Sequence, residues 1–359
     1  MSTRTVRRRH LAFRTLGVAV LTVLTTAAPA AADPAGPTNY QSEIVRIEPP
    51  SSAFTASVVG GDSFVVIEQV EPVSIEVPGY NGEPYLRYRA DGTVERNRNA
   101  PATFLNNDRY GDATNADLPA EASADAEPDW EIVATDGTYA WHDHRAHWML
   151  TEPPLGLGPG DQIVDDVIPL VVGSQDVELV VASYWQAPPS PIPAVAGGLL
   201  AVAIGAFVWW QRRGVWPGVL AAGMAGLAVG AAQFLSLPAA TEPSKALWLL
   251  PLIGCLAALG AGATWRRPAT ALPLAFGGSV AIVVAGVARR GGITKAVLPT
   301  DLPFWLDRWA TTFSLVLGLA MTVVTGVMLV AVLSPSSGSP GGAGSLEAGS
   351  EAGSSPTES

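Results

Sequence analysis

The chain has 359 residues, a net charge of −11 and a mean hydropathy of +0.27. An acidic charge combined with a positive hydropathy indicates an acidic soluble part joined to an apolar membrane part. Nucleic-acid binding is excluded as a function class, because it requires a basic surface. The single cysteine, Cys255, excludes an intrachain disulfide and every zinc site built on cysteine pairs.

Residues 1–32 are predicted to be a secretion signal peptide. Arginines at positions 4 and 7 to 9 precede the apolar segment LGVAVLTVLTTAA. Ala30-x-Ala32 has the small residues typical of a signal-peptide cleavage site. We therefore expect the mature chain to begin at Asp33 and the following domain to be exported.

Residues 33–187 are predicted to form an extracytoplasmic all-β sandwich, immunoglobulin-like or similar. Short segments rich in Val, Ile, Tyr and Phe alternate with turn residues, as in YLRYR followed by the hairpin turn ADGT. The segment DDVIPLVVGSQDVELVVAS predicts two strands around Gly173-Ser174, and strand alternation places Val177, Leu179 and Val181 on one face.

Residues 194–333, after the proline-rich linker 188–193, are predicted to form an all-α bundle of five transmembrane helices. Each span has close to the ~20 residues that a bilayer requires, and the spans cover residues 192–210, 215–236, 246–264, 270–288 and 311–333. The short basic connections QRRG and WRRP predict the cytoplasmic side. The expected protein is therefore a multi-pass plasma-membrane protein with an extracellular N-terminal domain and a disordered cytoplasmic tail, residues 334–359.

The interiors of the predicted spans contain no ionisable residue, which disfavours a transporter or a membrane oxidoreductase. Gly226 and Gly230 form a GxxxG pattern, which predicts close helix packing inside the bundle. The alternative is that the glycine-rich helices contact an envelope protein or a second copy of the chain. Trp305 and Trp309 predict a short amphipathic helix along the membrane interface.

The segment WHDHRAHWM, residues 141–149, contains three of the four histidines in the chain. Imidazole nitrogen binds copper and zinc, and a thioether sulfur adds a preference for Cu(I). His142, His144, His147 and Met149 are therefore candidate metal ligands, with copper or zinc as the candidate cofactor. In a regular strand His142 and His144 share a face and His147 lies on the other, so the three converge only if the chain turns after His144.

Two other interpretations of this segment are open. Asp143 and Arg145 can form an ion pair, so the histidines can belong to a packed polar cluster that only stabilises the domain. Histidine also titrates near neutral pH, which allows a pH-sensitive site. Because no GxSxG, HExxH or P-loop motif is present, no catalytic residue is predicted. The predicted function is a non-enzymatic, membrane-anchored binding module, and the alternative is a structural scaffold of the cell envelope.

The order of these features resembles a family of actinobacterial envelope proteins with a signal peptide, a β domain carrying WHDHRAHWM, a proline-rich linker and a C-terminal helix bundle. The resemblance runs from NYQSEIVRIEP to VLPTDLPFWLDRW, and the nine-residue motif is its most specific part. It implies the cell surface of a high-GC Gram-positive bacterium and says little about activity.

Overall fold

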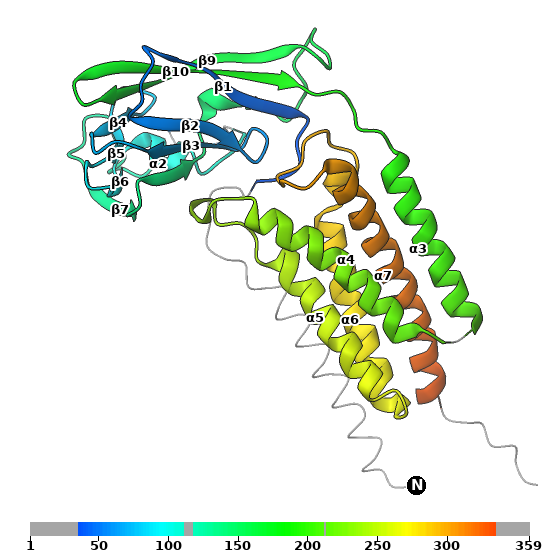
Figure 1. The fold of residues 1–359 in the computed structure, drawn as a ribbon. Coiled ribbons are helices and arrows are strands. Elements are labelled where there is room, and N and C mark those ends of the chain that lie inside the picture. The colour runs from blue at the N-terminus through cyan, green and yellow to red at the C-terminus, as the bar shows by residue number, and fades with distance from the viewer. Residues whose placement is uncertain (1–34, 111–117, 212, 335–359) are drawn as a thin grey trace, which may run out of the picture.

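The computed structural model describes residues 35–110, 118–211 and 213–334. A β-sheet domain lies at one end of a bundle of long helices (Figure 1). The predicted fold class is confirmed, because two antiparallel sheets are followed by five helices long and apolar enough to cross a membrane. The predicted signal peptide and the predicted tail beyond residue 334 lie outside the described residues.

The β domain contains a seven-stranded and a three-stranded antiparallel sheet. The larger sheet has the order β1-β10-β9-β4-β5-β6-β7 and the smaller has the order β2-β3-β8. A short helix, α2 (Pro101–Leu105), follows β6. The strands are β1 (Tyr40–Glu48), β2 (Phe54–Val59), β3 (Phe64–Gln69), β4 (Ile75–Pro78), β5 (Pro84–Tyr88), β6 (Val94–Asn97), β7 (Trp130–Ala134), β8 (Thr138–Trp141), β9 (Gln162–Val172) and β10 (Gln175–Trp185).

The core of this domain lies between the two sheets. Val177, Leu179 and Val181, predicted to share a face, are all buried in it. Burial of such a side chain contributes about 1.5–3 kcal/mol, so this face fixes the register of β10. The predicted hairpin is also confirmed, because β9 and β10 pair on either side of a turn in which Gly173 has a φ of 63°.

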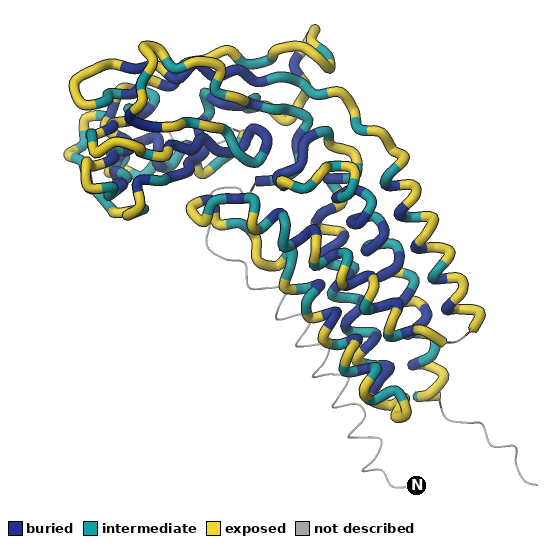
Figure 2. Tube along the Cα trace, viewed as in Figure 1, coloured by how far each residue is buried: buried dark blue, intermediate teal, exposed yellow. Residues whose placement is uncertain are grey.

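The membrane part consists of α3 (Ile192–Gln211), α4 (Val215–Leu235), α5 (Ala246–Ala263), α6 (Pro268–Ala288) and α7 (Phe304–Leu333). Helix α7 packs against α3, α4 and α6, and α5 packs against α4 and α6. The outward side of α3 is exposed (Figure 2), as expected of a surface that faces lipid. The short connections between the helices include two 3₁₀ turns, η3 (Ala239–Thr241) and η4 (Arg290–Ile293).

The glycines of α4 face the inside of the bundle. A Cβ atom at Gly230 would lie 2.1 Å from the carbonyl oxygen of Leu247, and one at Gly226 would lie 2.7 Å from the hydroxyl of Ser314. Any larger residue would push α4 away from α5 and α7. The prediction of internal packing is therefore confirmed for these glycines.

The fifth span differs from its prediction at the start. Helix α7 begins at Phe304 and runs without a break, so Trp305 and Trp309 lie in its first turns. The prediction of a separate amphipathic helix was wrong. Pro303 precedes the first helical residue, and the helix continues from Phe304 to Leu333. As a consequence, Asp307 and Arg308 belong to the helix and are buried.

The β domain contacts one end of the bundle, which we call the proximal end; the opposite end is the distal end (Figure 1). Thr38, just before β1, forms two backbone hydrogen bonds of 3.0 and 2.9 Å with Val297 in the α6–α7 connection. Leu237, after α4, packs with Phe64 and Ala140 of the small sheet. Apolar packing and backbone pairing therefore join the two parts.

Candidate metal site

The three histidines of WHDHRAHWM lie close together in space. Strand β8 ends one residue before His142, and a 3₁₀ turn, η2 (His144–Ala146), follows at once. Asp143 initiates this turn, because its carboxylate accepts the backbone N–H of Arg145 at 3.1 Å. The turn brings one ligand nitrogen from each of His142, His144 and His147 within 4.8 Å of the others. The condition set by strand alternation, a turn at His144, is met.

Each imidazole uses one ring nitrogen for a hydrogen bond to a backbone carbonyl. His142 Nδ1 lies 2.6 Å from the oxygen of Ser63, His144 Nε2 lies 2.7 Å from that of Asp108, and His147 Nδ1 lies 3.0 Å from that of Trp148. A carbonyl oxygen only accepts, so each of these nitrogens carries the hydrogen and donates. The second nitrogen of each neutral ring therefore keeps a free electron pair.

Two of these second nitrogens are buried without a partner. His142 Nε2 and His147 Nε2 form no hydrogen bond within the described part of the chain. A buried polar atom without a partner costs about 1–3 kcal/mol. The two atoms belong to adjacent rings whose centroids are 4.4 Å apart. Their lack of partners indicates a binding site for a group that accepts electron pairs, such as a metal ion.

Burial also keeps the rings of His142 and His147 neutral. Removal from solvent is the main cause that lowers the pKa of His142 to about 4 and the pKa of His147 to about 2, and the nearby Arg109 guanidinium lowers both further. Neutral imidazole is the form that coordinates a metal ion. His142 and His147 are therefore in the correct protonation state for metal binding at neutral pH.

Aromatic side chains fix the orientation of two of the rings. Tyr80 stacks on His144 with ring centroids 5.6 Å apart, and its hydroxyl accepts the backbone N–H of His144 at 2.9 Å. The same hydroxyl donates to the side-chain oxygen of Asn106. Phe64 meets His142 edge to face. These contacts restrict the rotamers of the rings, as the partners of metal ligands commonly do.

Two buried ion pairs flank the cluster. Asp143 accepts two bonds of 2.8 Å from the Arg145 guanidinium and one of 2.9 Å from the Trp141 indole. Burial alone would raise the pKa of Asp143, but these contacts hold it below its usual range. Arg109 pairs with Asp62 at 2.6 Å. The predicted Asp143–Arg145 pair is confirmed, and both carboxylates have charge partners other than the histidines.

Three imidazole ligands fit copper or zinc, which bind imidazole nitrogen at about 2.0–2.1 Å. In a tetrahedral arrangement such bonds place the nitrogens about 3.4 Å apart, so the rings need only a small inward movement. The half-buried Met149 follows His147 by two residues, and its role as a fourth ligand stays a prediction.

Sequence reasoning found the histidines but missed the groups that orient them. The acceptors are the backbone carbonyls of Ser63, Asp108 and Trp148, and every residue type carries such a carbonyl. No side-chain pattern could therefore have identified them. Tyr80 also gave no signal, because it is distant from the motif in sequence.

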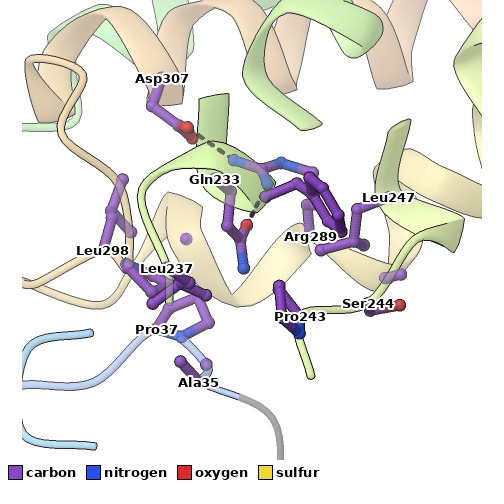
Figure 3. A pocket seen from close by; sticks show the side chains of 15 residues that line it. Ala35, Pro37, Gln233, Leu237, Pro243, Ser244, Leu247, Arg289, Leu298 and Asp307 are labelled. Carbon is purple, nitrogen blue, oxygen red and sulfur yellow. Dashed lines mark hydrogen bonds and ion pairs between the residues drawn. The ribbon is translucent and has the colours of Figure 1, made fainter. Parts of the chain in front are cut away.

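A second buried polar cluster lies at the proximal end of the bundle, beside a cavity of about 210 Å³ (Figure 3). The Arg289 guanidinium, at the end of α6, donates to Asp307 of α7 at 2.6 Å and to the side-chain oxygen of Gln233 of α4. Asp307 also accepts the hydroxyl of Thr311 at 3.1 Å. The cluster therefore joins the ends of three helices, and its charges neutralise each other.

Comparison of the sequence with protein-family models, with curated proteins and with solved structures gives no match. The resemblance to actinobacterial envelope proteins stays a prediction.

Proposed function

We propose that this protein is a membrane-anchored binding module that holds a copper or zinc ion on His142, His144 and His147. The observation that carries the proposal is the pair of buried imidazole nitrogens without hydrogen-bond partners, in a cluster where one ligand atom from each of the three histidines lies within 4.8 Å of the others. A cluster that only stabilised the fold would be expected to satisfy its polar atoms, because a half-satisfied buried network is costly.

Copper, as Cu(I), is the first candidate ion. The neutral His142 and His147 contribute no charge, and the flanking carboxylates of Asp143 and Asp62 are neutralised by Arg145 and Arg109. No nearby negative charge would neutralise the bound ion. Because burying a charge costs free energy, this favours a monovalent ion over Zn²⁺. The soft sulfur of Met149, two residues from His147, adds to this preference.

We propose binding rather than catalysis as the role of the site. A metal-dependent hydrolase usually needs a carboxylate or another base beside the metal-bound water. Both oxygens of Asp143 accept bonds from Arg145, and one also accepts the indole N–H of Trp141. This carboxylate is therefore occupied and unable to take up a proton from water.

We also propose that the distal end of the bundle faces the cytoplasm and that the β domain lies outside. Arg213, Arg266 and Arg267 lie in the distal connections, where the positive-inside rule expects them. At the proximal end Arg289 is neutralised by Asp307, and Arg308 donates to two backbone carbonyls of the α6–α7 connection. Their burial makes these proximal charges weak orientation signals.

Isothermal titration of the purified full-length protein in detergent tests the proposal. Cu(I) is supplied anaerobically as its acetonitrile complex, and Cu(II) and Zn(II) are titrated separately. We expect one ion per chain with a Kd below about 1 µM, a binding free energy near −8 kcal/mol. Weaker binding of all three ions would end the metal proposal and leave the structural interpretation of the cluster.

A further inference from the structure

A cavity of about 250 Å³ connects the histidine cluster with the membrane part of the chain. On one side it is lined by β-domain residues that include Tyr139, Asn106 and the buried His142. On the other side it is lined by the α4–α5 connection, including Thr241 and the exposed Glu242. The cavity therefore extends from a solvent-exposed carboxylate to an imidazole of the candidate metal site.

The walls of this cavity suit a cation. Tyr139, Asn106 and Thr241 line it, and their side chains carry hydroxyl or amide oxygens, although that of Asn106 already accepts the Tyr80 hydroxyl. One cationic side chain, Arg96, also lines it, but its guanidinium is held by Glu131 at 2.5–2.9 Å. The charge of Arg96 is thus compensated, whereas Glu242 forms no ion pair with any of the described residues.

The backbone of Glu242 is in a conformation that favours glycine. Its φ is 46° and its ψ is 55°, and it is the one non-glycine residue with a positive φ among those described. It follows the turn η3, where its N–H donates to Ala239 at 3.1 Å. A left-handed conformation costs an ordinary residue about 1–2 kcal/mol. Because glycine would avoid this cost, the position indicates a requirement for the carboxylate itself.

We propose that this cavity is the path by which the metal ion reaches His142, and that Glu242 captures the ion at its entrance. The proposal rests on the metal site proposed above. It gives the membrane part a role in loading the ion, because the entrance carboxylate belongs to the α4–α5 connection while the ligands belong to the β domain.

The expected effect of Glu242 is on the rate of binding. A carboxylate at the mouth of a cavity raises the local concentration of cations, so it speeds association. It is not a ligand, so the equilibrium affinity depends little on it. Its effect also decreases with ionic strength, because an exposed charge is screened within about 10 Å at 0.1 M salt.

Anaerobic stopped-flow mixing of the full-length protein with Cu(I) tests this proposal. The signal is the fluorescence of the tryptophans that flank the histidines, and the experiment is repeated with Zn(II). We expect Glu242→Gln and Glu242→Gly to slow association about threefold to tenfold at low salt, with an unchanged Kd. The control is Glu178→Gln, an exposed carboxylate on β10, which should load at the wild-type rate.

A second variant tests the path without changing a charge. Ala240→Trp places a large side chain in the cavity lining and should slow both loading and release. Wild-type association rates in all three variants would overturn the proposed path. A lower affinity of Glu242→Gln with an unchanged association rate would also overturn it, because Glu242 would then be a ligand. If the wild-type protein binds neither ion, the metal site itself fails.

Discussion

The molecule contains two buried polar clusters with opposite hydrogen-bonding states. At the proximal end of the bundle, the charges of Arg289 and Asp307 neutralise each other, and Gln233 and Thr311 complete the network. In the β domain, the histidines are fixed through one ring nitrogen each, and His142 and His147 keep a second buried nitrogen without a partner. The first cluster is complete without a ligand and the second is not.

This difference separates a structural role from a binding role more clearly than residue type does. A buried Arg–Asp pair in a membrane protein would usually be taken as a functional signal. Here its partners are all internal, and it joins the ends of α4, α6 and α7. His142 and His147 are neutral, yet each leaves one buried ring nitrogen without a partner. Variants of each cluster test this contrast.

The largest effect is expected from breaking the arginine cluster. Arg289→Leu leaves the buried carboxylate of Asp307 without its cation, which typically costs 3–5 kcal/mol. Thermal unfolding in detergent should show this loss. Arg290→Leu is the matched control, because Arg290 is exposed and its replacement should change stability by less than about 0.5 kcal/mol.

The double variant Arg289→Leu, Asp307→Leu should recover most of the lost stability, since replacing a whole buried pair by apolar residues is often nearly neutral. Metal affinity should stay at the wild-type value in all three variants. A change in metal affinity would show that the two clusters are coupled, contrary to the distinction drawn between them.

The second prediction concerns the histidine cluster. His147→Leu removes one of three ligands, so Cu(I) affinity should fall more than the 10- to 100-fold that loss of an outer partner costs. The stability of the metal-free protein should change by no more than about 1 kcal/mol, because a lost hydrogen bond to Trp148 is offset by removal of an unpartnered nitrogen.

Tyr88→Phe is the matched control for His147→Leu. The Tyr88 hydroxyl is also buried without a partner, but it lies in the core of the β domain. This variant should be as stable as the wild type and bind Cu(I) with unchanged affinity. If His147→Leu instead unfolds the domain, the histidines are structural.

The third prediction is stabilisation by the ion. A ligand that binds only the folded state adds about 2.7 kcal/mol at one hundred times its Kd. Cu(I) should therefore raise the melting temperature of the wild-type protein and of Arg289→Leu, and a chelator should reverse the shift. His147→Leu should show no shift, and an equal shift in that variant would place the ion elsewhere.

The smallest effect is expected at Tyr80. Tyr80→Phe keeps the stacking on His144 but removes the hydroxyl that accepts its backbone N–H. We expect a stability loss of about 1 kcal/mol and roughly tenfold weaker Cu(I) binding, because His144 is held less firmly. Unchanged affinity would show that the carbonyl of Asp108 alone orients this ring.

The long periodic elements of the fold could be predicted from the sequence. The five spans and the β9–β10 hairpin follow from runs of apolar residues whose length and alternation match the structure. The start of α7 could not, because the polar pair Asp307–Arg308 looks like a membrane boundary until Arg289 supplies its partner.

The residue types of the candidate site could be predicted, but its geometry could not. Strand alternation separates His147 from the other two histidines, and only the end of β8 and the turn η2 bring them together. The turn depends on the Asp143 side chain, for which the sequence pattern predicts only an ion pair with Arg145. The carbonyl acceptors and the unpartnered nitrogens depend on residues from three separate segments, so they are visible only in three dimensions.

The pairing of the first and last parts of the fold has a consequence for how the protein is made. Asn39 accepts a hydrogen bond at 3.2 Å from the backbone of Ala296, which follows it by 257 residues. Synthesis proceeds from the N-terminus, and domains generally fold as units in that order. The β domain is therefore complete well before the α6–α7 connection exists, so it docks on the membrane part only after that connection has been made.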